Sequence, residues 1–205
     1  AVRYQTGAGV SSSDLLGRDG AHWSYLLDSD ASVMYGSDWM PAGDGRFVAG
    51  PVQQTYSSLD LYLMGLLDPL KVAPFTLLRN PAIDVTAIPR EGDVVTAETE
   101  TIEIAQVLAA EGPRAPDHVV SPKAFRVAFI FLTAPGVEPS VEDMAAVETV
   151  RKHFPAHFFA LTRGVAVADT TLAEGPPVPR AVAPDLDRAM AWLLAKQAID
   201  GRFED

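Results

Sequence analysis

The sequence predicts an α+β fold in which helices outnumber strands around a small sheet. Apolar residues recur every three or four positions through residues 140–163, which is the spacing of one buried face of a long helix. A shorter, largely apolar helix is predicted at residues 57–67. Two stretches rich in β-branched or aromatic residues, 94–104 and 125–133, predict the strands of the sheet.

Length and composition fit one globular domain with at most a short appendage. The chain has 205 residues, of which 48% are hydrophobic and 21% charged, as in chains that bury a core. Its net charge of −11 argues against nucleic-acid partners and anionic membrane surfaces, which both require clustered Lys and Arg. No apolar run approaches the roughly 20 residues that span a bilayer. The absence of Cys excludes thiolate metal ligands, thiol nucleophiles and disulfides.

The first half of the chain is predicted to contain one long loop and one short helix. Residues 6–21 are rich in Gly, Ser and Asp, which predicts the loop. The helix at 57–67 can be capped by Ser57 or Ser58, and Asp60 suits its positive N-terminal end. Asp68, which precedes a proline, is expected to end it.

The middle of the chain is predicted to supply the sheet. Polar residues interrupt the apolar ones in residues 94–104, which indicates exposed strands. A short helix is expected at residues 105–111, ended by a Gly-Pro pair. Residues 125–133 carry little polarity, so they are expected to form a central strand covered on both faces.

The clearest predicted element is the long helix. Ser140 and Asp143 resemble a capping box at its start. Pro155 is expected to kink or split the helix because proline cannot donate the main-chain hydrogen bond. The stripe expected to lie on the core consists of Met144, Val147, Val150, Phe154, Phe158 and Leu161.

The chain is predicted to consist of a domain at residues 1–172, a Pro-rich linker at 173–184 and a helix within 185–205. The amphipathic stripe of this last helix is Leu186, Met190, Leu193 and Leu194. Because the sequence starts at Ala1 without a methionine, we expect a fragment or a processed product.

Three of the four histidines are not expected to bind metal. His153 and His157 have the i, i+4 spacing of a zinc-binding helix. Phe154 stands where zinc peptidases have a general-base Glu, however, and Pro155 disturbs the helical spacing. We expect this pair on a partly exposed helix edge and His118 in a solvent-exposed loop.

The carboxylates offer no site of recognisable spacing. Asp28 and Asp30 could open a calcium loop, but an EF-hand loop then needs Gly and Glu where this chain has Val33 and Trp39. Three further acids could be ligands, an acid/base pair, or turn and cap residues, and spacing selects none of them: Asp38, Asp44 and Asp60. No Gly-rich phosphate loop follows a predicted strand, and the sequence contains no Gly-x-Ser-x-Gly.

His22 stands in a more informative context. From the residues alone, a His beside a Trp is either a packed or capping residue or a ligand. The following segment, Ser32-Val33-Met34-Tyr35-Gly36, resembles the Met-turn of metzincin-type zinc metallopeptidases. The wider stretch, from His22-Trp23-Ser24 to Ser58-Leu59-Asp60-Leu61-Tyr62-Leu63-Met64-Gly65-Leu66, resembles a group of large secreted bacterial proteins. The resemblance covers about residues 1–172.

The metzincin resemblance implies a zinc site to which this chain contributes only a part. His22 is its implied third ligand, with Asp60 as the fallback, and the turn of Ser32, Met34, Tyr35 and Gly36 is its floor. The His-Glu-x-x-His helix of such proteins is absent here and is expected in a segment upstream of Ala1. The chain alone is therefore expected to be inactive. The resemblance further implies a protein or peptide substrate and an extracellular or periplasmic location.

Two other hypotheses remain open. In the first, the chain is a non-catalytic extracellular binding or structural module. In the second, it is an acidic interaction domain whose similarity to a Met-turn arises by chance. The end of the chain, Ala191-Trp192-Leu193-Leu194-Ala195-Lys196-Gln197 with Asp200-Gly201-Arg202-Phe203, is similar to the first helix and turn of an α/α-toroid repeat. An ordinary amphipathic helix with a Gly turn explains the same residues.

Overall fold

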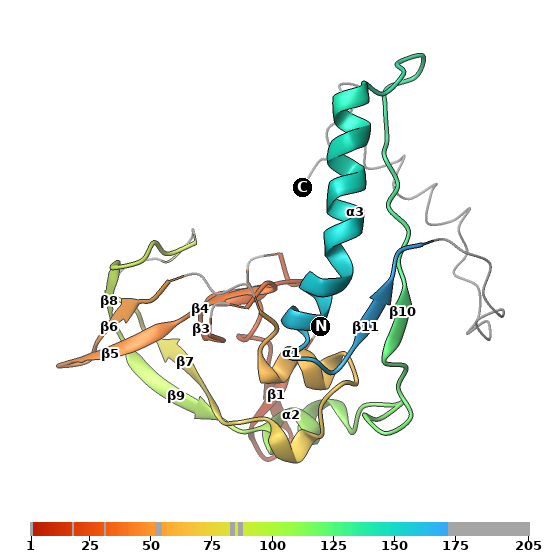
Figure 1. Cartoon of the computed structure of the whole chain (residues 1–205). Coiled ribbons are helices and arrows are strands. Elements are labelled where there is room, and N and C mark those ends of the chain that lie inside the picture. Colours follow the sequence, from red (N-terminus) through yellow and green to blue (C-terminus); the bar gives the residue numbers. More distant parts are fainter. Residues whose placement is uncertain are drawn as a thin grey trace. The chain divides into compact units, whose positions relative to one another are not determined.

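The structure is a computed structural model that describes residues 2–17, 19–30, 32–51, 55–82, 85 and 88–171 (Figure 1). These residues form eleven strands in four small sheets and three α-helices, so the prediction of a helix-rich fold is wrong. The architecture is mixed α/β with more strand than helix. The predicted linker at 173–184 and helix within 185–205 lie outside the described residues.

Four of the strands that the sequence does not predict are short and form two hairpins. Two of them, β1 (Tyr4–Gly7) and β2 (Val10–Ser12), lie largely where a loop is predicted and pair antiparallel. Another hairpin joins β5 (Trp39–Gly43) to β6 (Arg46–Ala49). Strands of three to five residues, containing Gly, Ser or Pro, are too short to show a period-two pattern. Pairing with a neighbour, rather than local propensity, makes them strands.

The central sheet has the order β4-β3-β7-β9. β3 (Trp23–Asp28) pairs parallel with β4 (Tyr35–Ser37) and antiparallel with β7 (Phe75–Arg79). β7 in turn pairs antiparallel with β9 (Glu98–Ile102). A second sheet has the order β5-β6-β8 and ends on β8 (Val94–Thr96).

Two apolar clusters lie on opposite sides of β7. Its neighbouring residues Leu77 and Leu78 are both nearly inaccessible, and consecutive strand residues point to opposite faces. Leu78 joins the cluster of the second sheet, with Trp39 and Val95. Leu77 joins the larger cluster, whose buried members are Tyr4, Leu15, Trp23, Leu27, Leu59, Tyr62, Val72, Leu77, Ile102 and Val107.

Two short helices contribute to the larger cluster. α1 (Ser58–Leu63) starts at a capping box formed by Ser57 and Asp60. It ends earlier than predicted because Gly65, with φ of +75°, turns the chain out of the helix. Asp68 instead caps the 3-10 turn η1 (Pro69–Lys71). α2 (Ile104–Glu111) ends at Gly112, close to the prediction.

The chain divides into two compact units. The first comprises Ala1–Phe125 and Pro155–Ala168, and the second comprises Arg126–Phe154 and the chain from Asp169 onward. In the region of the predicted central strand, only β10 (Ala124–Arg126) is a strand, and it pairs with β11 (Val167–Asp169). The prediction of a strand through residue 133 is wrong.

The long helix, α3 (Val141–Leu161), exists, but its predicted burial is only partly correct. Phe158 and Leu161 are buried, whereas the Met144 and Val150 side chains are 47% and 54% exposed. Periodicity identifies the apolar face of a helix, but it does not show that another element packs there.

The helix continues through Pro155 without a break. Proline lacks the N–H that would bond to the carbonyl of Arg151, four residues earlier. The Thr170 hydroxyl donates to that carbonyl oxygen at 3.1 Å instead. The second unit therefore supplies its own substitute for the lost helical bond. Among the described residues, no helix is both long and apolar enough to cross a membrane.

Candidate functional site

His22 is held by the carboxylate of Asp19 in the turn just before β3. The Asp19 carboxylate accepts the main-chain N–H groups of Ala21 and His22, each at 3.0 Å, and bonds to Nδ1 of the His22 ring. These hydrogen bonds hold the pKa of Asp19 well below its usual range. An ionised carboxylate only accepts hydrogen bonds, so Nδ1 is the donor in this bond.

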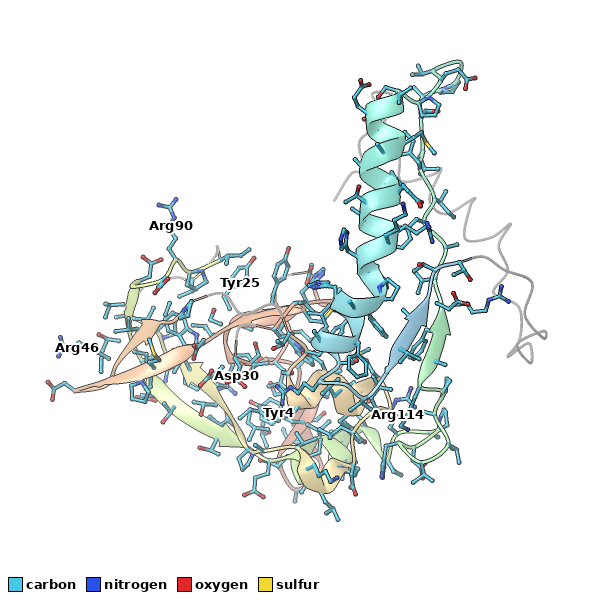
Figure 2. The ribbon with its side chains drawn as sticks, viewed as in Figure 1. Tyr4, Tyr25, Asp30, Arg46, Arg90 and Arg114 are labelled. Atoms are coloured by element: carbon cyan, nitrogen blue, oxygen red, sulfur yellow. The ribbon has the colours of Figure 1, made fainter. Side chains whose placement is uncertain are left out.

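The rest of the His22 ring faces Tyr35 and solvent. Its centroid lies 4.7 Å from that of Tyr35, and the Tyr25 ring, marked in Figure 2, lies 5.8 Å from the Tyr35 ring. The His22 side chain is 41% exposed, and within the described residues no hydrogen bond to Nε2 is found. Nε2 is therefore the ring atom left to bind a ligand.

Residues 32–35 form a tight turn against the start of β3. The N–H of Tyr35 donates to the Ser32 carbonyl at 3.0 Å, and the N–H of Met34 donates to the Ser32 hydroxyl at 2.9 Å. The N–H of Trp23 donates to the Met34 carbonyl at 3.0 Å. This last bond fixes the turn next to His22.

Asp60 connects the turn, β3 and α1 inside the first unit. Its Oδ1 accepts the indole N–H of Trp23 at 2.7 Å. Its Oδ2 accepts the Ser32 hydroxyl at 2.6 Å and the Ser57 N–H at 2.7 Å. The residue is 4% exposed. A carboxylate that is buried and engaged by three donors holds the fold together, so we do not carry the fallback ligand Asp60 into the proposed site.

Met34 is only partly buried in this chain, with 37% of its surface exposed. Met34→Ala is therefore expected to lower the free energy of unfolding by less than about 1.5 kcal/mol, below the usual 2–5 kcal/mol for a fully buried Met. Urea denaturation of both proteins measures the difference. A loss of about 2–5 kcal/mol would show that the Met34 side chain is covered in solution.

His118 and His153 have contacts of their own. His153 uses Nδ1 on the Thr149 carbonyl, 2.8 Å away along α3. His118 is half-buried rather than solvent-exposed as predicted, with Nε2 3.7 Å from a carboxylate oxygen of Asp68. Among the described residues, the group with metal-ligand geometry contains no histidine.

That group is three carboxylates, which sequence spacing does not reveal. Oxygens of Asp28, Asp30 and Asp38 all lie within 4.8 Å of one another. Asp28 and Asp30 share the end of β3, and the parallel register of Asp28 with Ser37 brings Asp38 beside them. Asp30, labelled in Figure 2, is exposed and borders a cavity of about 190 Å³ that Leu59 and Phe75 also line. Carboxylates so close can share a proton or a divalent cation.

The remaining unselected acid, Asp44, has a turn role. It sits between β5 and β6 with φ of +54°, a conformation that Asp tolerates in hairpin turns. Its carboxylate lies 3.8 Å from the Arg46 guanidinium at the surface.

The carboxylate cluster gives the fold a pH dependence. Burial, together with the charges of Asp30 and Asp38, raises the pKa of Asp28 from 3.8 to about 6. The folded state therefore binds this proton more tightly than the unfolded state, and stability falls as pH rises from about 4 to about 6. Partial exposure of the group limits the effect to at most about 2 kcal/mol.

Asp28→Asn is expected to remove that slope and to stabilise the protein at pH 7, because asparagine carries no charge to desolvate. Urea denaturation across this pH range, compared with Asp44→Asn as a control, measures it. An unchanged slope in Asp28→Asn would show that the dependence arises elsewhere.

Comparison with known proteins identifies no relative of this chain. No protein-family model matches the chain, no curated protein matches its sequence, and no solved structure matches its fold.

Proposed function

We propose that this chain supplies His22 as one ligand of a zinc centre in a secreted, zinc-dependent endopeptidase-like domain. The turn at Ser32, Met34, Tyr35 and Gly36 forms the floor of that centre. The remaining ligands are proposed to lie on a His-Glu-x-x-His segment, which this sequence does not contain. The chain is accordingly proposed to be inactive by itself.

One observation carries the proposal, namely the bond from His22 Nδ1 to the ionised Asp19 carboxylate. Metal-ligating histidines almost always donate their second ring N–H to such an acceptor, which fixes the tautomer and ring orientation and raises the basicity of the ligating nitrogen. The contact of the ring with Tyr35 adds a second restraint on its orientation.

The chemistry expected of the complete site follows from a three-ligand zinc centre. Zinc held in this way leaves one position for a water molecule whose pKa falls to about 7. The contribution of this chain is to hold a neutral imidazole in position and to supply the wall beside it. Protein or peptide substrates and an extracellular or periplasmic location belong to the proposal and derive from the metzincin resemblance.

The alternative is a non-catalytic extracellular binding or structural module. The observation in its favour is that Ser32 of the turn donates to Asp60 of α1, which also accepts the indole N–H of Trp23. In that case the same residues stabilise the fold, and His22 has no metal to bind.

Elemental analysis of zinc separates the two proposals. We would compare this chain with a version joined at Ala1 to a segment bearing a His-Glu-x-x-His helix. We expect one zinc ion per joined chain, which is lost in His22→Gln and kept in the control His153→Gln. Zinc that persists in His22→Gln, or a folded joined protein without zinc, would overturn the zinc proposal. The second outcome would favour the non-catalytic module.

A further inference from the structure

The second unit presents an apolar face that nothing in its described residues covers. After β10 the chain runs alongside α3 toward the far end of that helix (Figure 1). Phe129 points to the helix, with its ring 5.4 Å from that of Phe154. Ile130 and Leu132, on either side of Phe131, are 79% and 77% exposed.

The sequence of this stretch is that of a segment with two covered faces. Residues 127–132 are all apolar, whereas a segment with one face in water normally alternates apolar and polar residues. Large apolar side chains that project together from a surface mark a place where another element packs. We therefore expect another segment to pack on the face defined by Ala128, Ile130 and Leu132.

We propose that the occupant is the segment 185–197 of this same chain. This segment lies outside the described residues, but its sequence carries one apolar stripe of matching character: Leu186, Met190, Leu193 and Leu194. A stripe with that spacing can lie on one side of a helix and needs an apolar surface to cover it.

The chain path brings the two partners together. β11 ends at Asp169, whose carbonyl accepts the N–H of Val127 at 2.9 Å, so the chain leaves β11 at the foot of the exposed face. The Pro-rich spacer up to residue 185 can extend by about 3 Å per residue. The stretch from Val127 to Leu132 rises by a similar amount per residue, roughly 3.3 Å, but it has far fewer residues. The spacer is therefore long enough to reach the end of the exposed face. A tether of this length keeps the segment at a high effective concentration.

A second copy of the chain is the less favoured occupant. Each chain carries a net charge of −11, and like charges oppose association of copies. An intramolecular partner joins the face without bringing a second such charge to it. This inference concerns the second unit and does not rest on the proposed zinc centre.

Cysteine pairs in the full chain test the inference cleanly because the protein has no other cysteine. Leu132→Cys combined with Leu193→Cys is expected to form an intramolecular disulfide at least about tenfold faster than Leu132→Cys combined with Ala195→Cys. The tether brings both residues to the face equally, but docking through the apolar stripe holds residue 193 against the face and residue 195 away from it. Ala195 lies opposite the stripe on a helical wheel. Equal rates for the two pairs, or only intermolecular disulfides, would overturn the inference.

Amide hydrogen exchange gives a second test that needs no cysteine. Leu193→Asp should increase exchange in residues 128–133, whereas the matched Ala195→Asp should leave it unchanged. The same exchange in both variants and the unaltered protein would contradict docking. That result would be expected if the segment instead begins a toroid-like repeat.

Discussion

Asp60→Ala is expected to lower the free energy of unfolding by about 3–5 kcal/mol, because it removes the acceptor of several buried donors. The indole N–H of Trp23, the Ser32 hydroxyl and the Ser57 N–H all donate to this carboxylate. Water cannot easily replace it, because Asp60 is 4% exposed. Urea denaturation monitored by tryptophan fluorescence measures the loss and also reports on Trp23.

Asp68→Ala is the matched control for this prediction. Asp68 also caps a helical turn, but it accepts the N–H of Leu70 at 2.9 Å near the surface. Its loss is expected to cost about 1 kcal/mol, as for an ordinary N-cap. Equal effects of the two substitutions would contradict the account of Asp60 as the residue that ties the turn to α1 and β3.

Gly36→Ala is expected to destabilise the protein by about 2–4 kcal/mol through backbone strain combined with a steric clash. Gly36 follows the turn with φ of +79°, a conformation that alanine rarely adopts. A Cβ there would overlap the Ser29 hydroxyl and approach the Leu27 carbonyl oxygen to 3.0 Å. That hydroxyl donates to the Tyr35 carbonyl at 2.9 Å, so the turn itself must shift.

Gly43→Ala separates the clash from the strain. Gly43 has φ of +80°, but a Cβ at this position meets nothing within 4 Å. Strain alone should cost about 1–2 kcal/mol. If thermal or urea unfolding gives the same loss for both glycines, the close packing of the turn on β3 is wrong.

The helices could be predicted from the sequence because their evidence is local. The capping residues of α1 and the glycine after α2 lie within a few positions of the helices that they limit. The strands within residues 94–104 could also be predicted, and β8 and β9 confirm them. β1 and β2 could not be predicted, because each is a strand only through its pairing with the other. The burial of α3 cannot be predicted from local sequence either, because the exposure of Met144 depends on what packs against the helix.

The candidate site divides in the same way. The metzincin resemblance points to His22, and its partner Asp19 lies only three residues earlier, so an Asp-x-x-His pattern in the sequence is the local signal of this pair. The bond from Trp23 to Asp60 joins residues 37 positions apart. Such contacts are products of the fold. The meeting of Asp38 with Asp28 depends in the same way on the parallel pairing of β3 with β4.

Nitrogen NMR of the histidine rings during addition of zinc to the joined protein, which supplies the other proposed ligands, tests the central claim most directly, because it observes His22 Nε2 itself. We expect zinc to shift the His22 Nε2 resonance more than the ring resonances of His153 and His157. A His22 ring that stays unchanged while another site takes up the metal would contradict the assignment of His22 as a zinc ligand.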